Sequence, residues 1–254
     1  MDPMRTEPAS AGPVRYPLSG AGIQRYALLR RDSVVAQMPS GESQTTVLGR
    51  TAFVTITWIA SDSGTRLTAQ VDSIRADSTQ GLLSAALDSA RGARWTALRL
   101  PSGAVQNFVG GSASLAGDQV RDQLALLFPP LPLAGAVPGA SWTDSTSAPA
   151  RVSAFETVER AVISAHAQSL EAPAGALLIE VTRNRTAAGQ STQFGQAITV
   201  SGTGVDSLAY RLGPDARVLH MEGQRTTDMT VVLPAIGQQV TAREYSFFVI
   251  TLLR

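Results

Sequence analysis

Apolar and polar residues alternate with a period of two over long stretches of the chain, the pattern of half-buried β-strands. Residues 53–59 and 66–72 alternate most clearly. Residues 61–64 lie between them and contain the glycine that a tight turn needs, so the two segments predict a β-hairpin. The apolar positions that we expect on its buried face are Val54, Ile56, Trp58, Leu67, Ala69 and Val71.

The most β-prone run of the chain is residues 238–253. Apolar side chains occupy both of its faces at residues 247–250, so we expect this strand to be central in the sheet or to lie under a helix. Residues 152–170 fit two patterns. Phe155 and Val158 begin a helical stripe, whereas the β-branched residues of the segment favour a strand. The sequence leaves helix and strand open here.

Two short segments break the alternation and predict helices. Residues 82–91 are rich in Ala and Leu, contain no β-branched residue and are followed by Gly92, a common helix stop. Residues 118–128 place their apolar side chains on one stripe, and the prolines at 129–130 prevent continuation. Gly202-Thr203-Gly204 lacks the third glycine of a dinucleotide-binding loop, and we expect it to form a hairpin turn.

The chain divides into a short arm and a single large domain. Four prolines within residues 1–20 predict a flexible N-terminal arm. Residues 21–254 then form one β-rich domain. The predicted fold is mainly β: a large antiparallel curved sheet or open half-barrel built from two similar meanders, with one or two short helices.

The two meanders are suggested by an internal similarity. Residues 97–105 and 209–218 share a strand–turn–strand pattern with the same order of apolar and turn residues. We interpret this similarity as an internal duplication with pseudo-repeats at about 24–116 and 152–254. Residues 118–150 would form the crossover between them.

Composition excludes several classes of chemistry. All 21 basic residues are Arg, there is no Cys, and there are only two His. Lysine Schiff bases, thiol nucleophiles, thiolate metal sites and multi-histidine metal cages are therefore excluded. The formal net charge of +1 gives no reason to expect a nucleic-acid partner. No apolar run approaches the ~18 residues of a membrane-spanning helix, so we expect no transmembrane segment.

The remaining catalytic groups are scattered. His166 and His220 are isolated in the sequence, and residues 110–114 lack the closing glycine of a nucleophile elbow. The closest carboxylate pairs predict ordinary surface charge. They are Asp72 and Asp77, Asp118 and Asp122, and Glu156 and Glu159. We expect no enzymatic activity, no cofactor and no metal.

Four arginines offer a weak signal for anion binding. Arg183 and Arg185, together with Arg30 and Arg31, could form an anion-binding spot because guanidinium groups pair well with carboxylates and phosphates. Scattered, solvated surface arginines are the favoured interpretation.

Residues 127–142 form a Pro- and Gly-rich element with large apolar side chains near its ends. Its marked positions are Phe128, Leu131, Pro132, Val137, Gly139 and Trp142. This element resembles an "LP…V..G..W" stretch that lies between two β-rich halves in uncharacterised bacterial secreted proteins and lipoproteins. The resemblance implies an extracytoplasmic, mainly antiparallel β-protein, related to the open half-barrels of lipoprotein-carrier proteins, and it implies no catalytic residues. In physical terms, Phe128 and Trp142 would fasten the crossover against the sheet.

Two functions fit these observations. The first is a non-catalytic accessory or scaffold protein, periplasmic or otherwise extracytoplasmic, that binds another protein of the cell envelope through its strand edges. The alternative is a carrier for a lipid or other apolar ligand in the concave face of the sheet. An empty concave face lined by aromatic side chains would favour the carrier, and a helix filling that face would favour the scaffold, which we rank first. The candidate binding and anchor residues are Phe53, Trp58, Phe128, Trp142 and Phe247.

Overall fold

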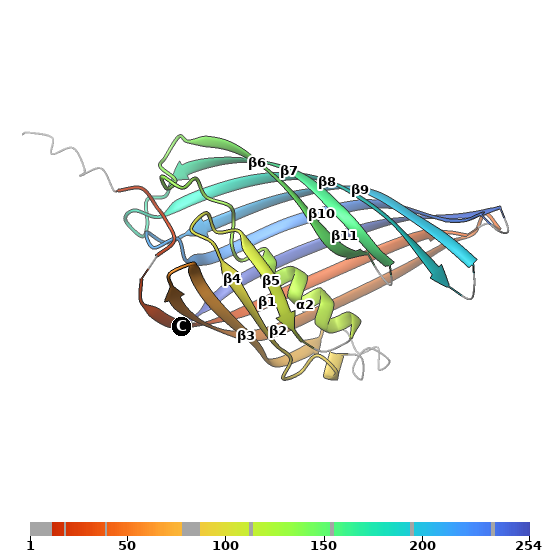
Figure 1. Ribbon diagram of the computed structural model, residues 1–254, viewed down its shortest axis with the longest axis horizontal. Coiled ribbons are helices and arrows are strands. Elements are labelled where there is room, and N and C mark those ends of the chain that lie inside the picture. The colour runs from red at the N-terminus through yellow and green to blue at the C-terminus, as the bar shows by residue number, and fades with distance from the viewer. Residues whose placement is uncertain are drawn as a thin grey trace, which may run out of the picture.

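The protein folds into one large, curved antiparallel sheet with a helix against its concave face, as seen in a computed structural model (Figure 1). The structure describes residues 12–17, 19–38, 40–77, 87–111, 114–152, 155–193, 196–234 and 237–254. The strands are β1 Ala21–Gln37, β2 Ser43–Ser61, β3 Gly64–Ala76, β4 Arg94–Arg99, β5 Val105–Gly110, β6 Ser141–Val152, β7 Phe155–Ser169, β8 Leu177–Gln193, β9 Gln196–Leu212, β10 Val218–Leu233 and β11 Gln238–Leu253. The helix is α2, Leu115–Ala125.

The first and the last strand of the chain lie side by side in the middle of the 11-stranded sheet. The strand order is β5-β4-β3-β2-β1-β11-β10-β9-β8-β7-β6. Strands that follow one another in sequence are paired, except β5 and β6, and β1 pairs with β11 and so joins the two halves of the chain. The sheet is not closed, and β5 and β6 form its two edges. The prediction of a mainly β, antiparallel, curved and open sheet is confirmed.

The predicted alternation sets the two faces of the sheet. The β2–β3 hairpin turns at residues 62–63 as expected, and the side chains of Val54, Ile56 and Val71 are buried on the concave side. Strand β11 is central, as predicted, and buries Phe248. It is not covered on both faces, because Phe247 points to the other side and is exposed. Helix α2 packs on the concave side of the sheet.

Helix α2 begins and ends three residues earlier than the predicted 118–128. Ser114 precedes it as N-cap, and its hydroxyl accepts a hydrogen bond from the Gly117 N–H at 3.1 Å. Val120 and Leu124 are fully buried, and the Gln123 amide donates to the Leu29 carbonyl of β1 at 2.7 Å. These contacts seat α2 on the sheet. No helix among the described residues is both long enough and apolar enough to cross a membrane.

Three other predicted segments have definite outcomes. Residues 152–170, which fitted both patterns, form strand β7 from Phe155 to Ser169. Gly202-Thr203-Gly204 is not a turn but lies in the middle of β9, so that prediction is wrong. Of the helix predicted over 82–91, residues 82–86 lie outside the described residues. Its end is described, and Gly92 has the positive φ of +75° that a glycine stop requires.

Part of the predicted N-terminal arm is packed against the domain. Val14 forms a β-bridge with Ala136 of the crossover, and the buried Tyr16 hydroxyl donates to the Pro129 carbonyl at 2.8 Å. Residues 12–17 therefore belong to the folded body, contrary to the predicted flexible arm over 1–20, while residues 1–11 and 18 lie outside the described part. Trp142 donates from its indole N–H to the Pro130 carbonyl at 3.0 Å. The crossover is thus tied to both the N-terminal segment and β6.

Candidate functional site

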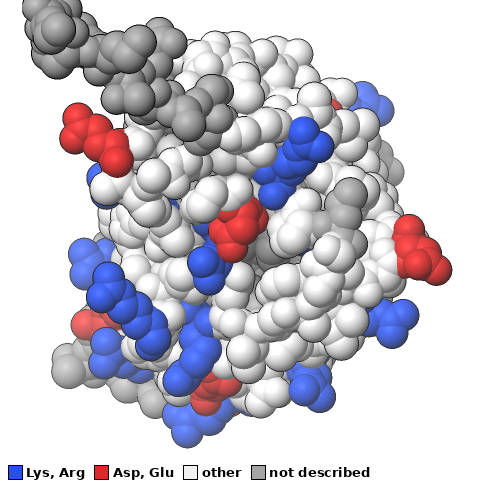
Figure 2. Space-filling view, turned by 90° about the vertical axis from the view of Figure 1, so that its left-hand side faces the viewer, with Lys and Arg blue, Asp and Glu red and all other residues white. Residues whose placement is uncertain are grey.

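Helix α2 fills the middle of the concave face, and a hollow lies toward each end of the sheet. One hollow, of about 430 Å³ including the solvent at its mouth, lies where β2 ends and β10 begins. Its lining includes Tyr16, Tyr26, Trp58, Arg99, Phe128 and Arg217. We call it the aromatic hollow. Figure 2 looks onto this end of the molecule, where basic side chains gather at the lower left and much of the remaining surface is uncharged.

Local packing positions the aromatic side chains of this hollow. Trp58 lies directly opposite Gly22 in the β1–β2 ladder. A Cβ at position 22 would lie 2.6 Å from Trp58 Cε2, so the indole rests on the glycine backbone and needs the missing side chain. The Tyr26 hydroxyl donates to Gln24 Oε1 at 2.8 Å. Burial raises the pKa of the Tyr26 hydroxyl, so this group stays neutral and serves as a donor.

Arg99 of β4 is the cation of the aromatic hollow. Its Nη2 donates to Thr65 Oγ1 at 3.0 Å and to the Pro17 carbonyl at 3.3 Å. Its guanidinium carbon lies 4.5 Å from the ring centroid of Tyr16 and 5.8 Å from that of Phe128. Its Nε is buried without a hydrogen-bond partner. Burial lowers the pKa of Arg99, partly offset by Tyr16.

On the concave side of β7–β10, a largely buried network of charges lies beside the apolar core. Asp206 is fully buried and accepts hydrogen bonds from Arg225 at 2.9 and 3.0 Å and from Arg185 at 3.0 Å. Glu159 accepts from Arg185 at 3.0 Å and from Arg183 at 2.8 Å. Burial acts to raise the pKa of the Asp206 carboxyl, but the guanidinium groups, that of Arg225 above all, outweigh it and hold that pKa below its usual range.

The network continues onto the central strands. Arg30 of β1 donates to Asp32 at 2.7 and 2.8 Å and to Glu244 of β11 at 2.9 Å. The guanidinium carbons of Arg30 and Arg225 each lie 5.3 Å from the ring centroid of Phe248, which both can contact as cation–π partners. Since Arg30, Arg183 and Arg185 all have carboxylate partners, the predicted anion-binding spot is not formed. The favoured alternative of solvated arginines is also wrong for the buried Arg30.

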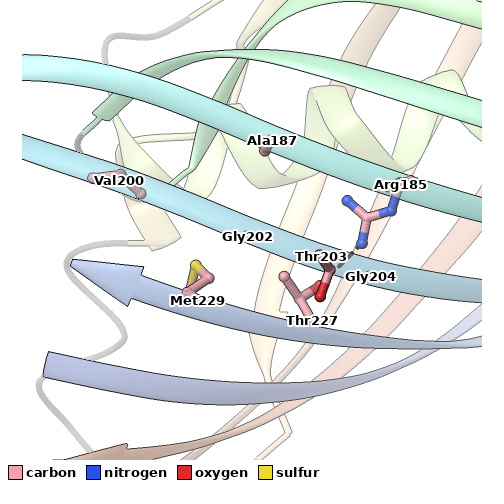
Figure 3. A pocket seen from close by; sticks show the side chains of 8 residues that line it. All are labelled: Arg185, Ala187, Val200, Gly202, Thr203, Gly204, Thr227 and Met229. Atoms are coloured by element: carbon pink, nitrogen blue, oxygen red, sulfur yellow. Dashed lines mark hydrogen bonds between the residues drawn. The ribbon is translucent and has the colours of Figure 1, made fainter. Parts of the chain in front are cut away.

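The second hollow, of about 290 Å³, adjoins this network. Figure 3 shows the Arg185 guanidinium reaching toward Thr227 beside Gly204; Nη2 donates to the threonine hydroxyl at 3.0 Å. A Cβ at position 204 would lie 2.7 Å from Arg185 Nη2, so Gly204 leaves the space that the arginine occupies. Gly202 and Ala187 keep the rest of the lining small. All donor nitrogens of Arg185 therefore have partners within the protein.

The five candidate binding and anchor residues do not form one site. Trp58 and Phe128 line the aromatic hollow. Trp142 is half-buried and packs against the core from β6, whereas the half-buried Phe53 ring has Arg75 over it, 5.6 Å from its centroid. Phe247 is exposed. The sequence analysis missed Arg99, Tyr16 and Tyr26. The alternation of β1 and β2 places both Tyr26 and Trp58 on the buried face, and this signal could have identified Tyr26.

The two histidines lie apart and reach no buried cleft. His166 Nδ1 lies 2.9 Å from the Ser141 hydroxyl, and Glu180 is its register partner on β8. These residues lie on the outer face of the sheet. The Ser141–His166 contact is exposed there and is not shielded from water. His220 contacts Thr251 instead, at 3.2 Å. Within the described ranges, no group of three or more metal-ligating side chains occurs.

The unpaired edge of β6 is a second candidate for binding. The Ser145 N–H donates to the Asp144 side chain at 2.7 Å, and Pro149 of the same strand has no N–H to donate. Because alternate residues of an antiparallel strand direct their N–H groups to the same side, residues 143, 145 and 147 direct theirs away from β7. The described part of the chain provides no strand on that side of β6.

Two exposed valines accompany this edge. Val158 and Val162 of β7 are 50% and 56% exposed, and they lie opposite Pro149 and Ser145 on the convex face. Two exposed β-branched side chains beside a free strand edge form a small apolar surface that another polypeptide could cover.

Comparison with protein-family models and with curated proteins finds no match for this sequence. The resemblance of residues 127–142 to secreted bacterial β-proteins therefore stays a prediction.

Proposed function

We propose that the protein is a non-catalytic, extracytoplasmic accessory protein that binds another protein of the cell envelope by accepting a strand at the edge of β6. The observation that carries this proposal is the open sheet: β6 pairs with β7 along its length, and no strand from the described part of the chain pairs with its other side. Strand addition to such an edge is a common mode of peptide recognition. The extracytoplasmic location rests on the resemblance of residues 127–142.

The concave face supports the scaffold over a lipid carrier. Helix α2 occupies the middle of that face, and its Val120 and Leu124 side chains are fully buried there. Two of the aromatic residues expected to line a lipid cavity, Phe53 and Phe247, are not among the residues that line either hollow.

Replacing Ser147 with Pro tests strand addition directly. Ser147 is exposed and directs its N–H away from β7, so proline removes a donor to the incoming strand without removing a bond of the β6–β7 ladder. We expect partner binding to be abolished, while the free energy of unfolding changes by less than about 1 kcal/mol. Ser147→Ala is the matched control and should bind normally.

Site-specific cross-linking locates the contact. Because the chain has no Cys, Thr143→Cys places a single thiol at the β6 edge, and Thr186→Cys places one on the convex face of interior strand β8. In intact cells, a membrane-impermeant maleimide cross-linker should join position 143, but not position 186, to one discrete protein. Ser147→Pro should abolish that product. Equal cross-linking from both positions, or recovery of monomer alone, would contradict the proposal.

A further inference from the structure

The aromatic hollow holds a cation that the protein does not neutralise. Arg99 has no carboxylate within ion-pair distance among the described residues, in contrast to Arg30, Arg185 and Arg225 of the central network. Its hydrogen bonds go to a carbonyl and a hydroxyl, both neutral acceptors. Arg99 is only 7% exposed, so water cannot solvate the whole guanidinium. A buried, unpaired charge of this kind is costly unless an anion joins it.

The remaining donors of Arg99 are compatible with such an anion. The hydrogen bonds of its guanidinium to Pro17 and Thr65 both come from Nη2. Nε has no partner, and no hydrogen bond to a described residue comes from Nη1. The side chain lines the hollow, so a ligand there can reach Nη1, whereas Nε is itself buried. A carboxylate is the simplest group that accepts from a guanidinium and neutralises it.

The walls of the hollow are suited to an apolar body. Trp58 is held on Gly22, and Ile56, Leu67 and Val218 add aliphatic surface. Arg217 stands at the exposed rim and is paired with Asp215 at 3.5 Å, so its charge is already compensated there. A pocket with one buried charge that lacks a counterion, beside aromatic and aliphatic side chains, selects a ligand with one anionic group and a compact apolar part.

We infer that the aromatic hollow is a binding site for a small organic carboxylate, whose carboxylate pairs with Arg99 and whose ring or short alkyl part lies against Trp58. This inference does not depend on the proposed strand addition at β6, because the two sites use different strands and different residues.

Calorimetric titration of the full chain tests the inference with two probes of nearly equal shape. Phenylacetate carries the carboxylate, and phenylacetamide replaces it with a neutral amide. We expect phenylacetate to bind with a dissociation constant of about 1 mM or tighter, and phenylacetamide to bind about 10- to 100-fold more weakly. Hexanoate should also bind, which would show that an alkyl body suffices.

Two substitutions test whether phenylacetate binds at Arg99. Arg99→Met should reduce phenylacetate binding about 10- to 100-fold and abolish the preference over phenylacetamide. Arg243→Met is the matched control, because Arg243 is an exposed arginine that pairs with Asp228 and does not line the hollow, and it should change affinity less than about 3-fold. Equal binding of the two probes by the wild-type protein, no detectable binding of either, or an unchanged preference in Arg99→Met would overturn the inference. The wild-type comparison decides the matter even where Arg99→Met fails to fold.

Discussion

Asp206→Asn is expected to lower the free energy of unfolding by about 3–5 kcal/mol, because it removes the shared counterion of two arginines. The Asp206 carboxylate is fully buried and binds Arg225 through both oxygens and Arg185 through one. Asparagine keeps the shape but loses the charge, and its amide places donors against the guanidinium donors. Arg225 would then keep no carboxylate partner among the described residues.

Urea unfolding at pH 7 measures this loss, and Asp228→Asn is its matched control. Asp228 lies on the neighbouring strand β10 and also pairs with an arginine, Arg243, but half of its side chain is exposed. Exposed ion pairs contribute little, so the control should change stability far less than Asp206→Asn. Equal losses in the free energy of unfolding of the two variants would show that burial does not make the Asp206 ion pairs more stabilising than an exposed pair.

The same carboxylate predicts a dependence of stability on pH. The folded-state pKa of Asp206 is held below the value of about 3.9 found in unfolded chains. A depressed carboxyl pKa stabilises the folded protein above the unfolded-state pKa, and this contribution is lost as the pH falls through the folded-state pKa. The difference in stability between wild type and Asp206→Asn should therefore be constant above about pH 5 and shrink below about pH 4. A difference independent of pH down to pH 2 would contradict the assignment.

The fold was predictable from the sequence because one face of each strand is buried. Alternation at residues 53–59 and 66–72 identified the β2–β3 hairpin and its buried face, since a period of two can be read without knowing the neighbours. The central place of β11 followed from its apolar run. The exposure of Phe247 could not be predicted from the alternation. The sequence does not show that α2 covers only the concave face and leaves the convex face open.

The buried charges were missed because charge was treated as a sign of exposure. Arg30 and Asp32 continue the inward parity of Tyr26 and Leu28 on β1. The alternation along β1 could therefore have predicted that Arg30 and Asp32 are buried. Their partners come from distant strands, however, and Glu244 lies 214 residues from Arg30. Only the sheet order brings such pairs together.

The glycines of β9 show a similar limit. Gly202 and Gly204 were taken as turn residues, because glycine within a strand is unfavourable on its own. In the fold, Gly204 gives room to the Arg185 guanidinium from the adjacent strand. The requirement for glycine thus arises from a side chain on another strand, which local pattern cannot reveal.

Arg50→Met is expected to act in the opposite direction and raise the free energy of unfolding. Arg50 is 4% exposed, and its Nε and Nη2 atoms have no hydrogen-bond partner. It lies directly opposite Arg30 in the β1–β2 ladder, and Arg30 already holds Asp32 and Glu244. Burial, together with the positive charge of Arg30, lowers the pKa of Arg50 to about 9. Within the described part of the chain, Arg50 thus has no ion-pair partner and lies beside a like charge, which Asp32 and Asp122 offset only in part.

Methionine fills a similar elongated space without a charge or an unmet donor. Replacing a buried ion pair with apolar residues of similar volume often stabilises proteins by about 1–4 kcal/mol, and we expect a gain in that range because no ion pair is lost here. Urea unfolding at pH 7 measures the gain. Arg50→Lys retains the charge and should show no gain, and exposed Arg25→Met should change stability by less than about 0.5 kcal/mol. A loss of stability in Arg50→Met, with Arg50→Lys unchanged, would mean that the positive charge itself holds this part of the sheet together.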